Sequence, residues 1–161
     1  MTTIEHAELK RILPHRHPIL QVDRVVEFEA DRRIVATKAI SGCEPCYADL
    51  ADDADHRFPA SLLVESMGQA GGVLWMHSAA LAGEPRSGTL IFGSAREVTL
   101  ADAAYPGDVL EHTVELESVK GDNAFMRGET RVGDRLIMTV ESMLAVLRED
   151  TELTQQEGER K

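Results

Sequence analysis

The chain has 161 residues, 43% of them hydrophobic, which suits one globular domain with a substantial core. Its formal charge of −11 argues against nucleic acid as a partner, because phosphate binding needs a positive surface. The 2 cysteines cannot build a secreted disulfide scaffold, so a reducing cytoplasm is expected.

The N-terminal part predicts a short helix and a hairpin. Residues 3–12 carry apolar side chains near helical spacing, and Pro14 ends the helix because proline disfavours helix in the preceding residue. Residues 19–30 and 34–40 place apolar or β-branched side chains on alternate positions around a turn at 31–32, which predicts two paired strands.

Residues 41–58 predict a long loop, because they hold several aspartates and glycine or proline breaks without a sustained period. Cys43 and Cys46 form a single CxxC motif without a second pair, so neither zinc nor redox chemistry is expected. The aspartates lack the spacing of an EF-hand calcium loop. We expect no metal and no cofactor.

The segment from Pro59 to Ala82 predicts a long helix, with proline at its start and Gly83 after its end. Apolar residues occupy nearly every face, so the helix must be buried on nearly all sides. Short turns then separate four alternating segments, which indicate an antiparallel sheet wrapped around the helix. These segments are 88–100, 109–119, 124–132 and 136–147.

Glu65 is the most informative residue of this helix, since burying an unpaired charge costs several kcal/mol. Gln69 lies one turn further on, where it can hydrogen-bond the carboxylate. Such a carboxyl suits general acid or base catalysis. The alternative is that Glu65 pairs structurally with an arginine across an interface.

The start of the helix offers a second chemical tool. Free N–H groups at Ala60 and Ser61 lie at the positive end of the helix dipole and can polarise a thioester carbonyl. Every helix has such an end, so a purely structural reading stays open.

Motifs between residues 13 and 147 resemble those of bacterial β-hydroxyacyl-ACP dehydratases. Residues 13–25 read LPHRHPILQVDRV, similar to the LPHRxPxLxVDRV of that family, and Glu44-Pro45 resembles its EPxF. Residues 58–72 read FPASLLVESMGQAGG, similar to MPGVLxxEAxxQAAG, and residues 105–110 read YPGDVL, similar to VPGDxL.

The resemblance implies an α+β hot-dog fold, in which a curved antiparallel sheet wraps one long helix and two subunits pair edge to edge. It implies that Glu65 is the catalytic carboxylate, with Gln69 beside it. It also implies that the N–H of Ala60 binds the substrate carbonyl, and we expect Phe58 and Ser61 to contact the substrate.

The chain departs from the family at the catalytic histidine, which removes the α-proton of the 3-hydroxyacyl thioester. Leu50 or Ala51 takes that position, depending on the direction of counting, and neither accepts a proton. His56 is the nearby candidate if the loop shifts. His15 and His17 resemble metal ligands by type only, and we expect a structural role for them.

Three functions stay open. In the first, the chain is a dehydratase subunit of fatty-acid or polyketide biosynthesis that completes a heterodimer with a histidine-bearing partner. In the second, it is an acyl-CoA or acyl-ACP thioesterase that uses Glu65. In the third, it is a non-catalytic acyl-binding or scaffold subunit. The partners expected are an acyl carrier protein or acyl-CoA and a second subunit, identical or different. An acidic carrier needs a local basic patch, for which the candidates are Lys10, Arg11, Arg16, Arg24 and Arg57.

No charged region followed by an apolar region, the pattern of a secretory leader, appears at Met1. No apolar segment reaches bilayer length, so a soluble, unprocessed, cytoplasmic protein is expected. The domain is predicted at 1–147, followed by a solvated polar tail at 148–161, which has almost no apolar content.

Overall fold

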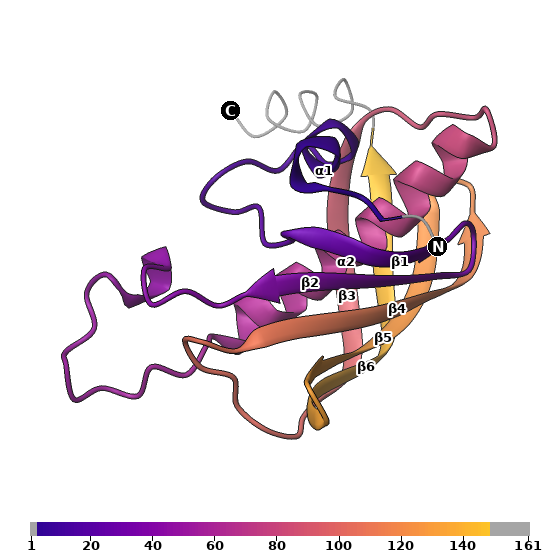
Figure 1. The fold of residues 1–161 in the computed structure, drawn as a ribbon. Helices are drawn as coiled ribbons and strands as arrows, with labels where there is room; N and C mark the ends of the chain where they lie inside the picture. The colour runs from indigo at the N-terminus through magenta and orange to yellow at the C-terminus, as the bar shows by residue number, and fades with distance from the viewer. Residues whose placement is uncertain (1–2, 149–161) are drawn as a thin grey trace, which may run out of the picture.

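One long helix lies against a six-stranded antiparallel sheet in the computed structural model, which describes residues 3–148 (Figure 1). The strand order is β1-β2-β4-β5-β6-β3. This is the α+β hot-dog arrangement that the family resemblance implies, so the predicted fold is confirmed. In chain order the elements are α1 His6–Ile12, β1 Arg24–Glu29, β2 Arg33–Ala39, the 3-10 helix η1 Pro45–Tyr47, α2 Ala60–Leu81, β3 Thr89–Leu100, β4 Val109–Lys120, β5 Asn123–Val132 and β6 Arg135–Arg148.

The first helix is shorter than predicted, because its expected first turn belongs to the sheet. Ile4 forms an isolated bridge with Val25 of β1, with N–H to O distances of 3.1 and 3.0 Å in the two directions. The helix therefore begins at His6. The predicted tail at 148–161 lies outside the described residues except for Arg148, which ends β6.

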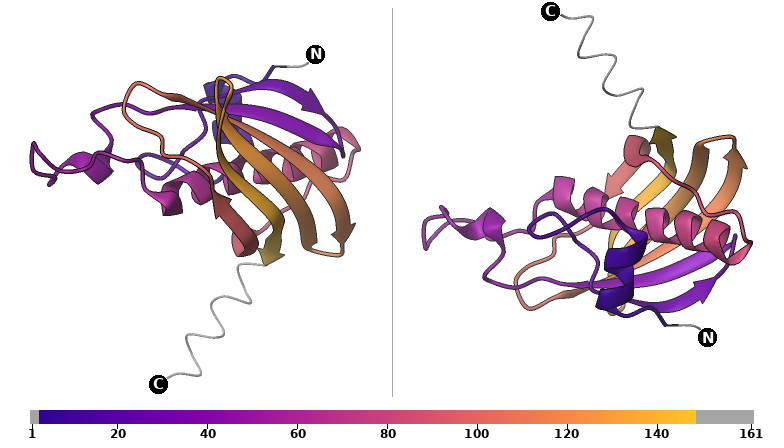
Figure 2. Two further views of the ribbon diagram at one scale, coloured as in Figure 1. Left: turned by 90° about the horizontal axis from the view of Figure 1, so that it is seen from below. Right: turned by 90° about the horizontal axis from the view of Figure 1, so that it is seen from above.

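The buried character predicted for the long helix is confirmed. Every residue of α2 from Ser66 to Trp75 is buried, and Figure 2 shows the helix lying along one face of the curved sheet. Small residues permit this close packing, because Gly68 faces the ring of Phe92 and Gly72 faces Leu90. Across residues 3–148, no helix combines the length and apolar character needed to cross a bilayer.

Gly128 is the position in the sheet where a small residue is most strongly required. A Cβ added there would lie 2.7 Å from the backbone oxygen of Thr113 on β4 and 3.1 Å from the sulfur of Met67. We expect Gly128→Ala to lower the free energy of unfolding by about 1–3 kcal/mol, because the β4–β5 ladder must shift. Urea denaturation measures this change. Gly42→Ala is the control, since no atom lies within 4 Å of its added Cβ.

Candidate active site

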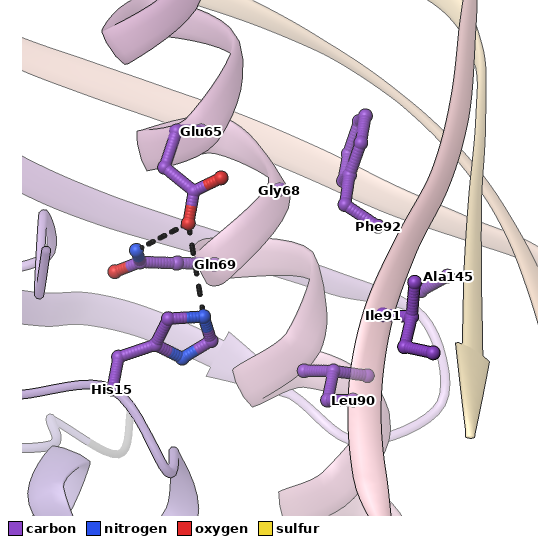
Figure 3. A pocket seen from close by; sticks show the side chains of 8 residues that line it. All are labelled: His15, Glu65, Gly68, Gln69, Leu90, Ile91, Phe92 and Ala145. Atoms are coloured by element: carbon purple, nitrogen blue, oxygen red, sulfur yellow. Dashed lines mark hydrogen bonds and ion pairs between the residues drawn. The ribbon is translucent and has the colours of Figure 1, made fainter. Parts of the chain in front are cut away.

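Glu65 lies in the second turn of α2 and lines a small pocket, with about 20 Å³ of room, that is partly open to solvent (Figure 3). The side chain of Glu65 is 30% exposed to solvent. Glu65 is therefore half-buried rather than buried as predicted, because the pocket opens to water beside it. The lining residues are His15, Glu65, Gly68, Gln69, Leu90, Ile91, Phe92 and Ala145.

Gln69 fixes the carboxylate, as its position one turn along the helix predicted. Its Nε2 donates to Oε1 of Glu65 at 2.7 Å and to the backbone oxygen of Ile19 at 2.7 Å. Its Oε1 accepts the N–H of Gln21 at 2.7 Å. With both ends of the amide engaged, only one orientation of the Gln69 side chain satisfies its partners.

His15 reaches the same carboxylate from the segment after α1. Its Nε2 lies 3.7 Å from Oε1 of Glu65. Among the described residues its buried Nδ1 has no hydrogen-bond partner. Burial lowers the pKa of His15, opposed by the charge of Glu65 and assisted by that of Arg16, so the imidazole is neutral at neutral pH.

This contact corrects the sequence analysis, which left Glu65 without an imidazole from its own chain. The loop position of the family's catalytic histidine nevertheless holds exposed Leu50 and Ala51. His56 does not line the cavity. Its Nδ1 lies 2.8 Å from the oxygen of Ala54, and its ring packs against Tyr47 with centroids 5.8 Å apart.

The residues predicted to bind substrate lie apart from Glu65. Ala60 and Ser61 are exposed at the start of α2, whereas Phe58 is 1% exposed and donates its N–H to the oxygen of Ala104 at 2.8 Å. Phe58 and Ala60 line a second hollow, which shares no residue with the cavity of Glu65. One chain therefore presents the acid and the helix start at two different places.

The basic residues predicted to meet an acidic carrier are only partly available. Arg24 forms an ion pair with an acidic neighbour at 3.0 Å, and Arg57 does so at 3.3 Å. Lys10 and Arg11 are exposed in the last turn of α1, and Arg16 is exposed close by. This end of α1 lies on the same segment as His15.

The cysteine pair and the aspartate loop show no metal geometry. Cys43 and Cys46 are free thiols, and burial is the main cause that raises the pKa of Cys46. Among residues 3–148, no group of three or more His, Cys, Asp or Glu side chains is arranged to hold an ion.

A buried polar line behind Glu65 was missed from the sequence. It consists of Ser66, His112 and Thr130, each with 0% exposure. Nε2 of His112 lies 2.8 Å from Oγ of Ser66, and its Nδ1 lies 2.8 Å from Oγ1 of Thr130. Burial lowers the pKa of His112 to about 3, so its ring is neutral.

A family model described as a FabA-like domain matches residues 13–141. The 3-hydroxyacyl-[acyl-carrier-protein] dehydratase FabZ of Macrococcus caseolyticus is 32% identical over 147 residues, which cover 91% of this chain and 97% of that protein. The FabZ of Natranaerobius thermophilus is 36% identical over 129 residues, covering 80% and 87%.

Solved structures share the fold. One is the dehydratase heterocomplex ApeI:P from Xenorhabdus doucetiae, with a TM-score of 0.78, 22% identity and coverage of 92% and 95% of the two chains. The fluoroacetyl-CoA thioesterase FlK has a TM-score of 0.61, 16% identity and coverage of 84% and 98%. At these identities the likeness concerns the fold alone. The extent of the family match and the identity to the FabZ proteins together show that the chain belongs to the FabA-like domain family.

Proposed function

We propose that the chain is a cytoplasmic dehydratase subunit that supplies Glu65 to an active site whose imidazole comes from a partner subunit. The substrate is a 3-hydroxyacyl thioester on an acyl carrier protein, in fatty-acid or polyketide biosynthesis. The observation that carries the proposal is a carboxylate, held by Gln69, that lines a mostly apolar cavity. The names of the FabZ relatives support the reaction, and the ApeI:P heterocomplex supports a mixed assembly.

The reaction divides into two proton transfers. An imidazole takes the proton from C2, the C2–C3 double bond forms, and the C3–O bond breaks as Glu65 protonates the departing hydroxyl, which leaves as water. Oε2 of Glu65 performs this step, since Gln69 and His15 both approach Oε1. Glu65 begins this step protonated, and afterwards solvent takes the proton from the imidazolium and returns one to Glu65.

The thioester carbonyl needs a donor that Glu65 cannot provide. Backbone N–H groups at the start of a helix stabilise the developing charge on such an oxygen. Because Ala60 and Glu65 of one chain lie at separate hollows, a site that uses both groups draws them from two subunits.

The edge of the sheet offers the place for this pairing. β3 bonds to β6 on one side and lies at the edge of the described sheet on the other. Val98 and Leu100 near its end are 40% and 52% exposed, an apolar surface that a second subunit would cover. Leu100 also lines the hollow at the helix start, so a partner bound here adjoins Ala60.

The test measures double-bond formation and thiol release from 3-hydroxybutyryl-ACP and 3-hydroxybutyryl-CoA. We expect the purified chain alone to give neither product above background, and a histidine-bearing subunit from the same genome to bring about dehydration of the ACP substrate. Thiol release by the chain alone, lost in Glu65→Gln, would indicate a thioesterase instead. Full dehydration by the chain alone would remove the need for a partner.

His15 is the competing source of an imidazole, because it is neutral and close to Glu65. If the partner supplies the base, His15→Gln in the mixed complex changes kcat by about threefold or less, whereas loss of the base costs about 10²- to 10⁴-fold. Steady-state rates distinguish these outcomes. His17→Gln is the matched control, since His17 is an exposed histidine of the same segment. A hundredfold loss in His15→Gln alone would make His15 the base.

A further inference from the structure

The buried polar line has a single arrangement of hydrogen atoms. Oγ of Ser66 donates its hydrogen to the backbone oxygen of Gln21 at 2.7 Å, so the contact with His112 must use the Nε2–H of the ring as donor. A neutral imidazole then has a bare Nδ1, which accepts the hydroxyl hydrogen of Thr130. Every hydrogen bond therefore runs in one direction, from β5 through β4 to α2.

The peptide of Gln21 joins this line to the active site. Its oxygen accepts from Ser66, and its N–H donates to Oε1 of Gln69, three residues further along α2. Residue 21 lies outside any helix or strand, so these two helix side chains hold its backbone in place. Rotation of the Gln69 amide by half a turn would set its oxygen against the backbone oxygen of Ile19 and the Glu65 carboxylate, and its NH2 group against the N–H of Gln21.

The polar line is poorly explained by stability alone. Replacing both partners of a buried hydrogen bond by apolar groups of the same shape is nearly neutral, so the bond between His112 and Thr130 adds little to the stability of the core. What an apolar trio at these positions would lack is a defined position for the Gln21 peptide. Buried polar contacts of this kind specify one arrangement among several.

We propose that His112 is a positioning residue for Glu65. Through Ser66 and Gln21 it fixes the amide of Gln69, which keeps a donor on Oε1 and leaves Oε2 for the substrate. Figure 3 shows the second oxygen of Glu65 on the side of Phe92, away from Gln69 and His15. The inference rests on the proposed role of Glu65 and adds the buried line that keeps this acid in its working orientation.

The test compares two serines of the same helix in the complex with the histidine-bearing subunit, on 3-hydroxybutyryl-ACP. Ser66→Ala breaks the line, whereas Ser78→Ala removes an equally buried hydroxyl that accepts from the N–H of Asp31 at 2.8 Å. We expect Ser66→Ala to lower kcat about tenfold at unchanged KM, and Ser78→Ala to leave kcat within about twofold.

A second pair of variants separates positioning from folding. His112→Gln keeps one donor and one acceptor, so we expect it to retain at least half of the wild-type kcat. His112→Leu keeps neither, so we expect it to behave like Ser66→Ala. In NMR spectra of the chain, the side-chain amide signals of Gln69 move in Ser66→Ala and in the milder Thr130→Val, but not in Ser78→Ala.

Two results would overturn the inference. One is an equal kcat for Ser66→Ala and Ser78→Ala while Glu65→Gln is inactive, which leaves the proposed function intact. The other is an unchanged Gln69 amide in both Ser66→Ala and Thr130→Val. If Glu65→Gln keeps the wild-type rate, the proposed function itself fails, whatever the serine variants do.

Discussion

Glu65→Gln lowers the dehydration rate of the mixed complex by about 10²- to 10⁴-fold, the usual contribution of a positioned general acid or base. The amide keeps the shape of the side chain, and its oxygen still accepts the Nε2–H of Gln69, so only proton transfer is lost. Steady-state assays with 3-hydroxybutyryl-ACP give kcat and KM separately. We expect the loss to fall on kcat.

The control for this variant is Glu84→Gln, an exposed glutamate that follows the end of α2. Both variants replace a carboxyl group by an amide, so a general effect of this exchange on carrier binding appears in both. Retention of more than a tenth of the rate in Glu65→Gln would leave the acid without a catalytic role. The chain would then be better described as an acyl-binding or scaffold subunit.

The stability of the chain falls as the pH drops below about 6.5, with His112 as the main cause. Its pKa is about 3 in the fold, against 6.5 for the ordinary side chain. Between these values the unfolded chain binds a proton that the folded chain excludes, so the free energy of unfolding rises with pH. The stabilising contribution of neutral His112 is fully present above pH 6.5. The slope is about 1.4 kcal/mol per pH unit, or about 2 kcal/mol lost between pH 7 and pH 5.

Urea denaturation at pH 7 and pH 5 measures this loss, and His112→Gln, which cannot titrate, removes most of it. The lowered pKa of His15 acts in the same direction, so a smaller part of the slope remains. His6→Gln, at an exposed histidine of α1, is the matched control and keeps the full slope. An identical slope in wild type and His112→Gln would show that the ring is already protonated in the fold.

Local periodicity in the sequence was sufficient to predict the main helices and strands and one hydrogen bond of the site. The hydrophobic residues around α2 predicted a helix covered on nearly all sides, and the four-residue spacing predicted the hydrogen bond from Gln69 to Glu65. Both predictions depend only on the geometry of one helix. For this reason they did not require knowledge of how the chain folds back on itself.

Spacing along the helix also bears on how the helix start and the acid are placed. Ala60 and Glu65 are five residues apart, which places them about 140° apart around an ideal helix axis. The two side chains therefore leave the helix in different directions, and the two residues line separate hollows.

Contacts between distant segments could not be predicted in the same way. His15 is 50 positions from Glu65, and no periodic pattern connects the segment after a short helix to the second turn of a long one. His112 had a usable signal, because it lies between Leu110 and Val114 on the inward-facing alternation of β4. That pattern predicts a buried histidine, although not its partners on α2 and β5.

The central claim is that Glu65 completes a site whose imidazole belongs to another chain. It is tested most directly by mixing this chain with a histidine-bearing dehydratase subunit whose own catalytic carboxylate has been changed to an amide. Each chain alone should be inactive on 3-hydroxybutyryl-ACP, the mixture should form the double bond, and Glu65→Gln should abolish that gain. Two results would contradict the account. The first is a mixture in which the two chains associate but remain as inactive as each chain alone. The second is a mixture that is equally active when this chain carries Glu65→Gln.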